Sequence, residues 1–107
     1  MVNSVDKTVH EVHQAEGVVI IDVRRPDEYA QGHIKGSINM PLGEPITAEL
    51  KALMAHQIVV VHCRSGMRSQ SWLEQHINDI DAQAVWHMHE GMLGWLNASL
   101  PVEISHG

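Results

Sequence analysis

Apolar runs and amphipathic stretches alternate along most of the chain. Residues 18–23 and 58–61 are dominated by valine and isoleucine, which is typical of strands buried on both faces of a parallel sheet. Shorter strands are expected at residues 1–3, 38–40 and 84–88. Between the strands, apolar residues recur at steps of three and four, the spacing of a helix with one buried face. This spacing predicts helices over about residues 5–15, 47–56, 67–78 and 92–98. A short helix over about residues 26–32 is predicted instead from Pro26 at its first turn, Asp27 and Glu28 at its positive end and Gly32 at its close.

Two of these helices carry residue-level expectations. Asn3 or Ser4 offers an N-cap for the first helix, and Thr47 offers one for the third. The inward-facing residues should be Val5, Val9 and Val12 in the first of these helices and Leu50, Leu53 and Met54 in the other.

The order of these elements predicts the class of fold. Strands that alternate with helices across short connections imply parallel strands joined by right-handed crossovers. We therefore expect a three-layer α/β domain, a parallel sheet with helices on both faces, that occupies residues 1–107 as one unit. Ligands of such sheets bind outside the carboxyl ends of the strands.

A polar stretch, residues 63–69, separates the strand at 58–62 from the following helix. In this arrangement the backbone N–H groups of the loop and of the first helical turn face one concavity. Cys63, the only cysteine, should lie at its rim. The helix N-terminus and the guanidinium groups of Arg64 and Arg68 favour the thiolate, so we expect a nucleophile. The alternative is a buried, inert cysteine.

Three segments of the chain resemble the rhodanese family of sulfurtransferases. HCRSGMRS, residues 62–69, is similar to the active-site loop of that family. Residues 22–41, from Asp22-Val23-Arg24 to Pro41, resemble the first family signature, and residues 91–95 with Pro101 resemble the closing one. The resemblance implies a rhodanese-like parallel sheet of about five strands. It also implies that Cys63 is catalytic and that the substrate is bound by Arg64, Ser65, Gly66, Met67, Arg68 and Ser69.

The activity implied by this resemblance is sulfur transfer. Cys63 would take a sulfane sulfur from thiosulfate or a related anionic donor, hold it as a persulfide and pass it to cyanide or a thiol. No metal or organic cofactor is expected. One alternative is a noncatalytic or carrier module that binds a protein partner or delivers sulfur to it. A phosphatase or arsenate reductase is disfavoured, because the four residues between Cys63 and Arg68 are one fewer than in cysteine-based phosphatases.

Four polar positions near this loop have structural interpretations. Asp22 and Arg24 should pair with each other or with a neighbour such as Glu28, although Arg24 could instead face the substrate. Strand alternation should turn His62 away from Cys63, which favours a structural role.

Two positions near the last strand carry further expectations. His87 and His89 have a spacing that could hold a metal, but we expect both to be exposed. Glu90 stands where rhodanese-like domains usually have glycine, so glutamate would be strained if that position has positive φ.

Composition and charge restrict the partners. The chain is 44% hydrophobic and 19% charged, which indicates a packed globule. Its net charge of −6 argues against nucleic acid and anionic membranes as partners, and it requires local capture of an anionic substrate. No apolar stretch approaches the roughly eighteen residues of a membrane span. A free reactive thiol suits a reducing compartment, so we expect the cytoplasm; whether a leader was removed stays open.

Overall fold

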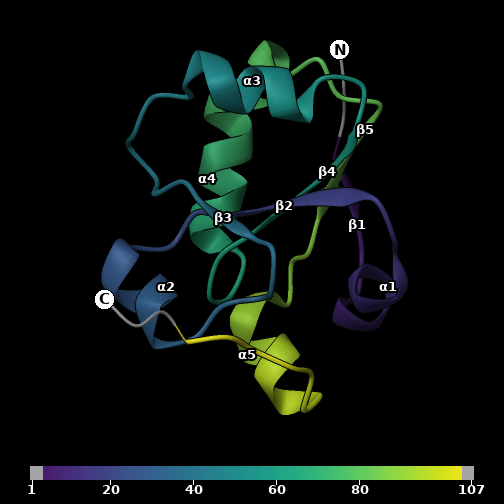
Figure 1. Cartoon of the computed structure of the whole chain (residues 1–107), viewed down its shortest axis with the longest axis vertical. Coiled ribbons are helices and arrows are strands. Elements are labelled where there is room, and N and C mark those ends of the chain that lie inside the picture. Colours follow the sequence, from purple (N-terminus) through teal and green to yellow (C-terminus); the bar gives the residue numbers. More distant parts are fainter. Residues whose placement is uncertain (1–3, 105–107) are drawn as a thin grey trace.

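Five parallel strands form the central sheet of the computed structural model, which describes residues 4–104 (Figure 1). The order across the sheet is β1-β5-β4-β2-β3, so β4 lies between β5 and β2. The predicted α/β class, with a parallel sheet and helices on both faces, is confirmed. The strands are β1 (Ser4–Asp6), β2 (Val18–Asp22), β3 (Ile38–Asn39), β4 (Ile58–His62) and β5 (Ala84–His87).

The helices divide the hydrophobic core into two parts, one on each face of the sheet. One part contains buried residues of α3 and α4, including Leu50 and Trp72, and the other contains residues of α1 and α5, including Val12 and Trp95. In the part of the chain that the structure describes, no helix is long and apolar enough to cross a membrane. The helices are α1 (Val9–Gln14), α2 (Pro26–Gln31), α3 (Ala48–Met54), α4 (Met67–His76) and α5 (Gly91–Asn97), with a 3₁₀ turn at Ile77–Asp79.

The start of the chain differs from the prediction. Ser4–Asp6 pairs with β5 as an edge strand, and Val5 is 53% exposed instead of buried on a helix. The helix begins only after Thr8, whose side chain forms a capping box with Glu11. The apolar steps from Val5 favour a helix locally, but pairing with β5 overrides them. The strand predicted at residues 1–3 lies outside the described residues.

The inward face of α3 is narrower than predicted. Thr47 caps the helix as expected, accepting a hydrogen bond from the Leu50 N–H. Leu50 and Met54, four residues apart, are buried, whereas Leu53 is 50% exposed. Leu53 therefore lies beside the line of buried residues on α3 that Leu50 and Met54 form, and not within it.

Strand alternation in β4 places the candidate nucleophile. Val59 and Val61 face the part of the core that α3 and α4 cover, and Cys63 continues the same two-residue period into that part. Val60 faces the opposite part with α1 and α5. Cys63 therefore leaves the carboxyl end of the central strand on the side where α4 begins.

Candidate active site

A tight loop connects Cys63 to the first turn of α4. Gly66 is the N-cap of this helix, with φ of 104° in the left-handed region. A Cβ atom at Gly66 would lie 2.7 Å from the carbonyl oxygen of His89, in the turn after β5. Backbone conformation and lack of space both require glycine there. Glycine thus allows the loop to pack against the end of β5.

The Cys63 sulfur receives hydrogen bonds from this loop. The Gly66 N–H donates to Sγ over 3.1 Å, and the hydroxyl of Ser69 lies 3.3 Å from Sγ. Burial disfavours the charged thiolate, but hydrogen bonds from the Ser69 hydroxyl and from the amides of Ser69, Gly66 and Ser65 outweigh it and lower the pKa of the Cys63 thiol. The site can therefore hold a negatively charged sulfur.

Cys63 is more deeply placed than predicted. The residue is 1% exposed, so it does not lie at an open rim. It is buried because it continues the core-facing side of β4 and the loop folds over it. Its surroundings are nevertheless polar at the sulfur, since the donors described above point to Sγ.

Backbone hydrogen bonds fix the loop to α5. Met92 N–H donates to the Cys63 carbonyl over 2.9 Å, and Leu93 N–H donates to the Arg64 carbonyl over 3.1 Å. Gly91 makes this approach possible, with φ of 64° and a hypothetical Cβ only 2.5 Å from the Cys63 oxygen. Glycine is thus required at Gly91 and not at the position before it.

Glu90 carries none of the strain that a left-handed position would impose. Its φ of −70° is helical, so the concern raised by the missing glycine is wrong for this chain. Its Oε1 atom accepts a hydrogen bond from Val9 N–H over 3.1 Å, at the start of α1. The glutamate therefore joins α5 to α1 across that face of the sheet.

Arg68 forms a forked ion pair with Glu28 of α2. Nη1 lies 2.6 Å from Oε1 and Nη2 lies 3.0 Å from Oε2. The hydrogen bonds from Arg68 lower the pKa of the Glu28 carboxyl to about 2, against the opposing effect of burial. Arg68, which was predicted to bind substrate, is thus paired with a carboxylate. The sequence had suggested Glu28 only as an alternative partner in the Asp22–Arg24 pair.

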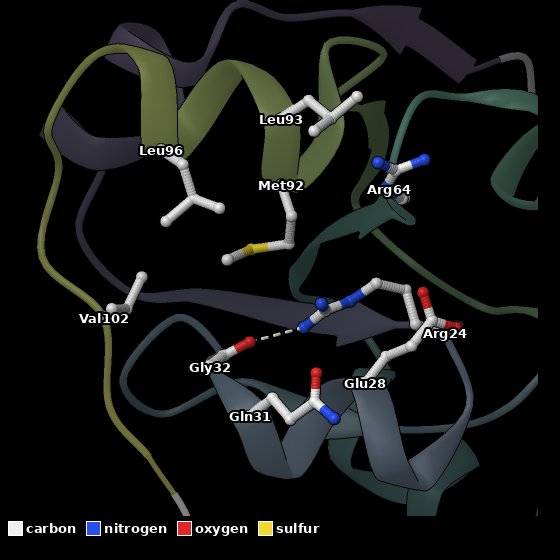
Figure 2. A pocket seen from close by; sticks show the side chains of 9 residues that line it. All are labelled: Arg24, Glu28, Gln31, Gly32, Arg64, Met92, Leu93, Leu96 and Val102. Carbon is white, nitrogen blue, oxygen red and sulfur yellow. Dashed lines mark hydrogen bonds between the residues drawn. The ribbon is translucent and has the colours of Figure 1, made fainter.

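Asp22 and Arg24 pair with each other at the end of β2, one of the two pairings that the sequence predicted. Nη2 of Arg24 lies 2.8 Å from Oδ2 of Asp22 and donates a second hydrogen bond to the Gly32 carbonyl (Figure 2). His62 is buried beside this pair, with Nε2 3.7 Å from Oδ2 of Asp22. Burial lowers the pKa of His62, although Asp22 opposes the shift. The His62 Nδ1 donates to the carbonyl of Cys63 and not to its sulfur.

A pocket of about 290 Å³ lies beside the loop. Figure 2 shows Glu28 and Gln31 of α2 on one side of it and Met92 and Leu96 of α5 on the other. Cys63 does not line this pocket, but its neighbour Arg64 does. The pocket therefore has a cationic edge and an apolar wall next to the nucleophile. Its remaining lining residues are Arg24, Gly32, Leu93 and Val102.

The loop residues predicted to bind substrate take different positions. Ser65, Gly66 and Ser69 direct donors to the sulfur, as described above. Arg64 is exposed at the pocket, and the Met67 side chain is 81% exposed.

His87 is a residue of this site that the sequence analysis placed in solvent. It is only 5% exposed, and its Nε2 atom lies 2.6 Å from the Ser69 hydroxyl. The signal was present in the strand pattern, because His87 shares a face with the buried Val85 and lies at the carboxyl end of β5. Within residues 4–104, no three His, Cys, Asp or Glu side chains gather in an arrangement that could hold a metal ion.

Comparisons with known proteins agree on one family. A model of the rhodanese-like domain matches residues 5–98. A sulfurtransferase of Allochromatium vinosum is 28% identical, with both chains covered completely. A rhodanese-related protein from Thermoplasma volcanium superposes with a TM-score of 0.78 at 25% identity, over 94% of this chain and 98% of its own. Thiosulfate sulfurtransferase from Pseudomonas aeruginosa superposes with a TM-score of 0.74 at 29% identity, over 96% of this chain and 21% of its own.

Other relatives are longer. The chain spans 52% of an uncharacterized Synechocystis protein and 43% of an HTH-type transcriptional regulator of Mycobacterium tuberculosis. The domain therefore also occurs as part of larger proteins.

Proposed function

This chain belongs to the rhodanese-like domain family, and from that membership we propose that it transfers sulfane sulfur through a persulfide on Cys63. Thiosulfate or a related anion would be the donor, and a thiol or cyanide would be the acceptor. The observation that carries the proposal is the hydrogen bonding of the Cys63 sulfur, by the Gly66 amide at 3.1 Å and the Ser69 hydroxyl at 3.3 Å. These donors stabilise negative charge on sulfur, which both the attacking thiolate and the persulfide carry.

The first half of the reaction loads the enzyme. The Cys63 thiolate attacks the outer sulfur of thiosulfate and forms a new S–S bond. The S–S bond of thiosulfate breaks, and its electron pair leaves with sulfite. The persulfide anion remains on the protein, so total charge is conserved and no external oxidant is needed.

The second half returns the enzyme to its starting state. Cyanide or a thiolate attacks the outer persulfide sulfur and leaves as thiocyanate or as a new persulfide. The electrons of the broken S–S bond return to Cys63 as thiolate. A reaction in two separate halves predicts ping-pong kinetics.

Among the loop arginines, Arg64 is the one that we assign to the anionic donor. It is exposed and lines the pocket, whereas Arg68 is held by Glu28. The amides of Ser65 and Gly66 and the hydroxyl of Ser69 then stabilise the transferred sulfur. The Met67 side chain is exposed and does not line the pocket.

Intact-mass measurement tests this function directly. After incubation with thiosulfate, the protein should gain one sulfur atom and lose it again on addition of cyanide. The Cys63→Ser variant should gain nothing. A wild-type protein whose mass does not change with thiosulfate or with another sulfane donor contradicts the proposal.

A carrier that delivers sulfur to a protein is the second candidate. The apolar side of the pocket remains partly open to solvent, with Leu93 39%, Leu96 53% and Val102 39% exposed, and could receive an apolar segment of a protein acceptor. Slow turnover with cyanide combined with fast persulfide transfer to one protein would favour this role.

The phosphatase alternative is disfavoured by the ion pair of Arg68. Glu28 takes two of the five N–H groups of the Arg68 guanidinium, so fewer of them are available to a phosphate at the end of the loop. Hydrolysis of an aryl phosphate that is lost in Cys63→Ser would revive the alternative.

A further inference from the structure

A chain of polar contacts runs from the nucleophile to the molecular surface. The Cys63 sulfur lies 3.3 Å from the Ser69 hydroxyl, which lies 2.6 Å from Nε2 of His87. Nδ1 of His87 in turn lies 3.6 Å from Oδ1 of Asp6. The contacts join the end of β4, the first turn of α4, β5 and β1.

The register of the sheet builds this chain of contacts. Asp6 and His87 are direct partners in the parallel pairing of β1 with β5, and the Lys7 N–H donates to the His87 carbonyl over 2.9 Å. Ser69 is fully buried and His87 is 5% exposed, whereas the Asp6 side chain is 73% exposed. Buried polar groups are held in one geometry more strictly than exposed ones. The Ser69–His87 contact should therefore be better ordered than the contact between His87 and Asp6.

The single proton of the Ser69 hydroxyl can be donated to only one neighbour at a time, and the Gly66 carbonyl, 3.1 Å away, is an acceptor besides His87 and Cys63. If Ser69 donates to His87, its oxygen is free to accept from the Cys63 thiol. If instead His87 carries a proton on Nε2 and donates to Ser69, the hydroxyl is free to donate to the Cys63 thiolate. The protonation state of His87 therefore decides which form of Cys63 the hydroxyl favours.

We propose that His87 is a positioning residue of this site, which controls the ionisation of Cys63 through the Ser69 hydroxyl. The inference deepens the proposed function and rests on it, because a thiolate is the species that attacks the sulfur donor. His87 does not touch the sulfur. It acts through Ser69, and the Asp6 carboxylate lies near its other ring nitrogen.

The proton balance of the step is closed within the protein. The S–H bond of Cys63 breaks as its proton moves to the Ser69 oxygen, and the hydroxyl proton moves to Nε2 of His87. The products are a thiolate, an unchanged hydroxyl and an imidazolium whose Nδ1–H faces the Asp6 carboxylate. Sulfur transfer regenerates the thiolate, so this step sets the resting state and is not repeated at every turnover.

The groups around His87 act on its proton affinity in opposite directions. Burial, the largest effect, lowers the pKa of His87, and His89 adds to it, while Asp6 opposes it. Burial leaves Nε2 unprotonated and able to accept from Ser69, and Asp6 is the group that stabilises the imidazolium once it has formed. The ionisable groups near His87 are Asp6 from β1, His89 after β5 and His62 at the end of β4, while Cys63 is connected to it through Ser69. Cys63 and His87 should titrate as a coupled pair.

The test is a titration of the thiolate, which needs no sulfur donor. The ultraviolet absorbance of the thiolate is followed against pH, and the titration of Cys63→Ser is subtracted. Glutamine cannot take up the proton and carries no positive charge, so in His87→Gln the pKa of Cys63 should rise, and at about pH 6 the thiolate fraction should fall roughly three- to tenfold. His10→Gln, which changes an exposed histidine of α1, should leave the titration unchanged.

Two further variants separate this coupling from a loss of structure. Asp6→Asn changes an exposed side chain and should raise the pKa of Cys63 in the same direction by a smaller amount. In Ser69→Ala the pKa should also rise, and adding His87→Gln to it should cause no further rise, because the connecting hydroxyl is gone. Full additivity of the two changes, or an unshifted Cys63 titration in folded His87→Gln, would overturn the proposal.

The outcome is separable from that of the proposed function. A shifted titration in a protein that never gains sulfur from a donor would reject the function and keep the coupling. Sulfur loading in a protein whose His87→Gln titration is unshifted would reject the coupling alone.

Discussion

Glu28 and Arg68 form a two-bond ion pair that joins α2 to the first turn of α4. The residues are 40 positions apart in the sequence, and their closest atoms, Oε1 and Nη1, are 2.6 Å apart. The contact connects the wall of the pocket to the loop that holds the nucleophile. Ser65, Gly66 and Ser69 act on the sulfur through the backbone or a hydroxyl, whereas Arg68 connects the first turn of α4 to α2 through its side chain.

Replacing this carboxylate should reduce stability in a pH-dependent way. The pKa of Glu28 is lowered to about 2 in the folded protein, from the 4.5 of a free glutamate, with Arg68 as the main cause. Its contribution to the free energy of unfolding is therefore complete above pH 4.5 and is lost as the pH falls towards 2. Glu28→Gln should lower the free energy of unfolding at neutral pH by about 1 kcal/mol, since the pair is partly exposed.

Urea unfolding near neutral pH and near pH 3 checks this expectation. The difference between wild type and Glu28→Gln should shrink at the lower pH. Glu16→Gln, which changes an exposed carboxylate after α1, is the control and should behave like wild type at neutral pH. A constant difference at both pH values would show that the ion pair is not the cause.

Gly91 should tolerate no side chain. In Gly91→Ala the new Cβ would approach the carbonyl oxygens of Arg64 and Cys63 to within 2.4 and 2.5 Å. Because both atoms belong to the backbone of the nucleophile loop, the variant should lose about 2 kcal/mol or more of stability. Gly36→Ala is the matched control: φ there is also positive, at 81°, but no atom lies within 4 Å of the new Cβ. It should lose only about 1 kcal/mol. Equal losses, measured by urea unfolding, would contradict the close approach.

Glu90→Gly restores the residue usual in the family and should nevertheless destabilise this chain. The change removes the acceptor of the Val9 N–H and adds backbone freedom at a helical position, which should cost about 1 kcal/mol. Glu90→Gln keeps an acceptor oxygen and should recover most of the loss. Thermal unfolding of the three proteins provides the comparison. A higher melting temperature for the glycine variant would mean that glutamate is strained after all.

Arg64→Ala should weaken capture of the sulfur donor without changing the nucleophile. The guanidinium is exposed at the pocket edge, so its loss should raise KM for thiosulfate and lower kcat/KM by about tenfold. The pKa of Cys63 should stay where it is, because the donors that lower it come from Ser69, Gly66 and Ser65. Lys51→Ala, at an exposed cation on α3, is the control for net charge. An equal loss in both variants would assign the effect to the overall charge.

Elements with strong local patterns could be predicted from the sequence. The valine run of β4 predicted a central buried strand, and the glycine-containing loop before α4 predicted a helix start directed at Cys63. The beginning of the chain could not be read in this way, since Val5 fits a helical period and becomes a strand residue only through pairing with β5.

The contacts around the site depend on the same long-range pairing. Nothing near Arg68 in the sequence points to Glu28, because the two lie on different helices that only the folded sheet brings together. The position of His87 was within reach of strand alternation, but its partner Ser69 comes from α4 and Asp6 comes from the opposite end of the chain. Sequence periodicity predicts which face of a helix or strand is buried. It does not predict which side chains from other elements pack against that face.

The two hydrogen bonds from α5 to the loop determine the direction of whole peptide units. In a trans peptide the C=O and the following N–H point in opposite directions. The Arg64 carbonyl is turned towards Leu93, so the Ser65 N–H of the same unit is turned the other way, to the side where it lowers the pKa of Cys63. The neighbouring helix thereby sets the polarity of the sulfur's surroundings by anchoring the oxygens that would repel it. Because main-chain groups create this polarity, a change of side chain at Arg64 or Ser65 should leave it in place.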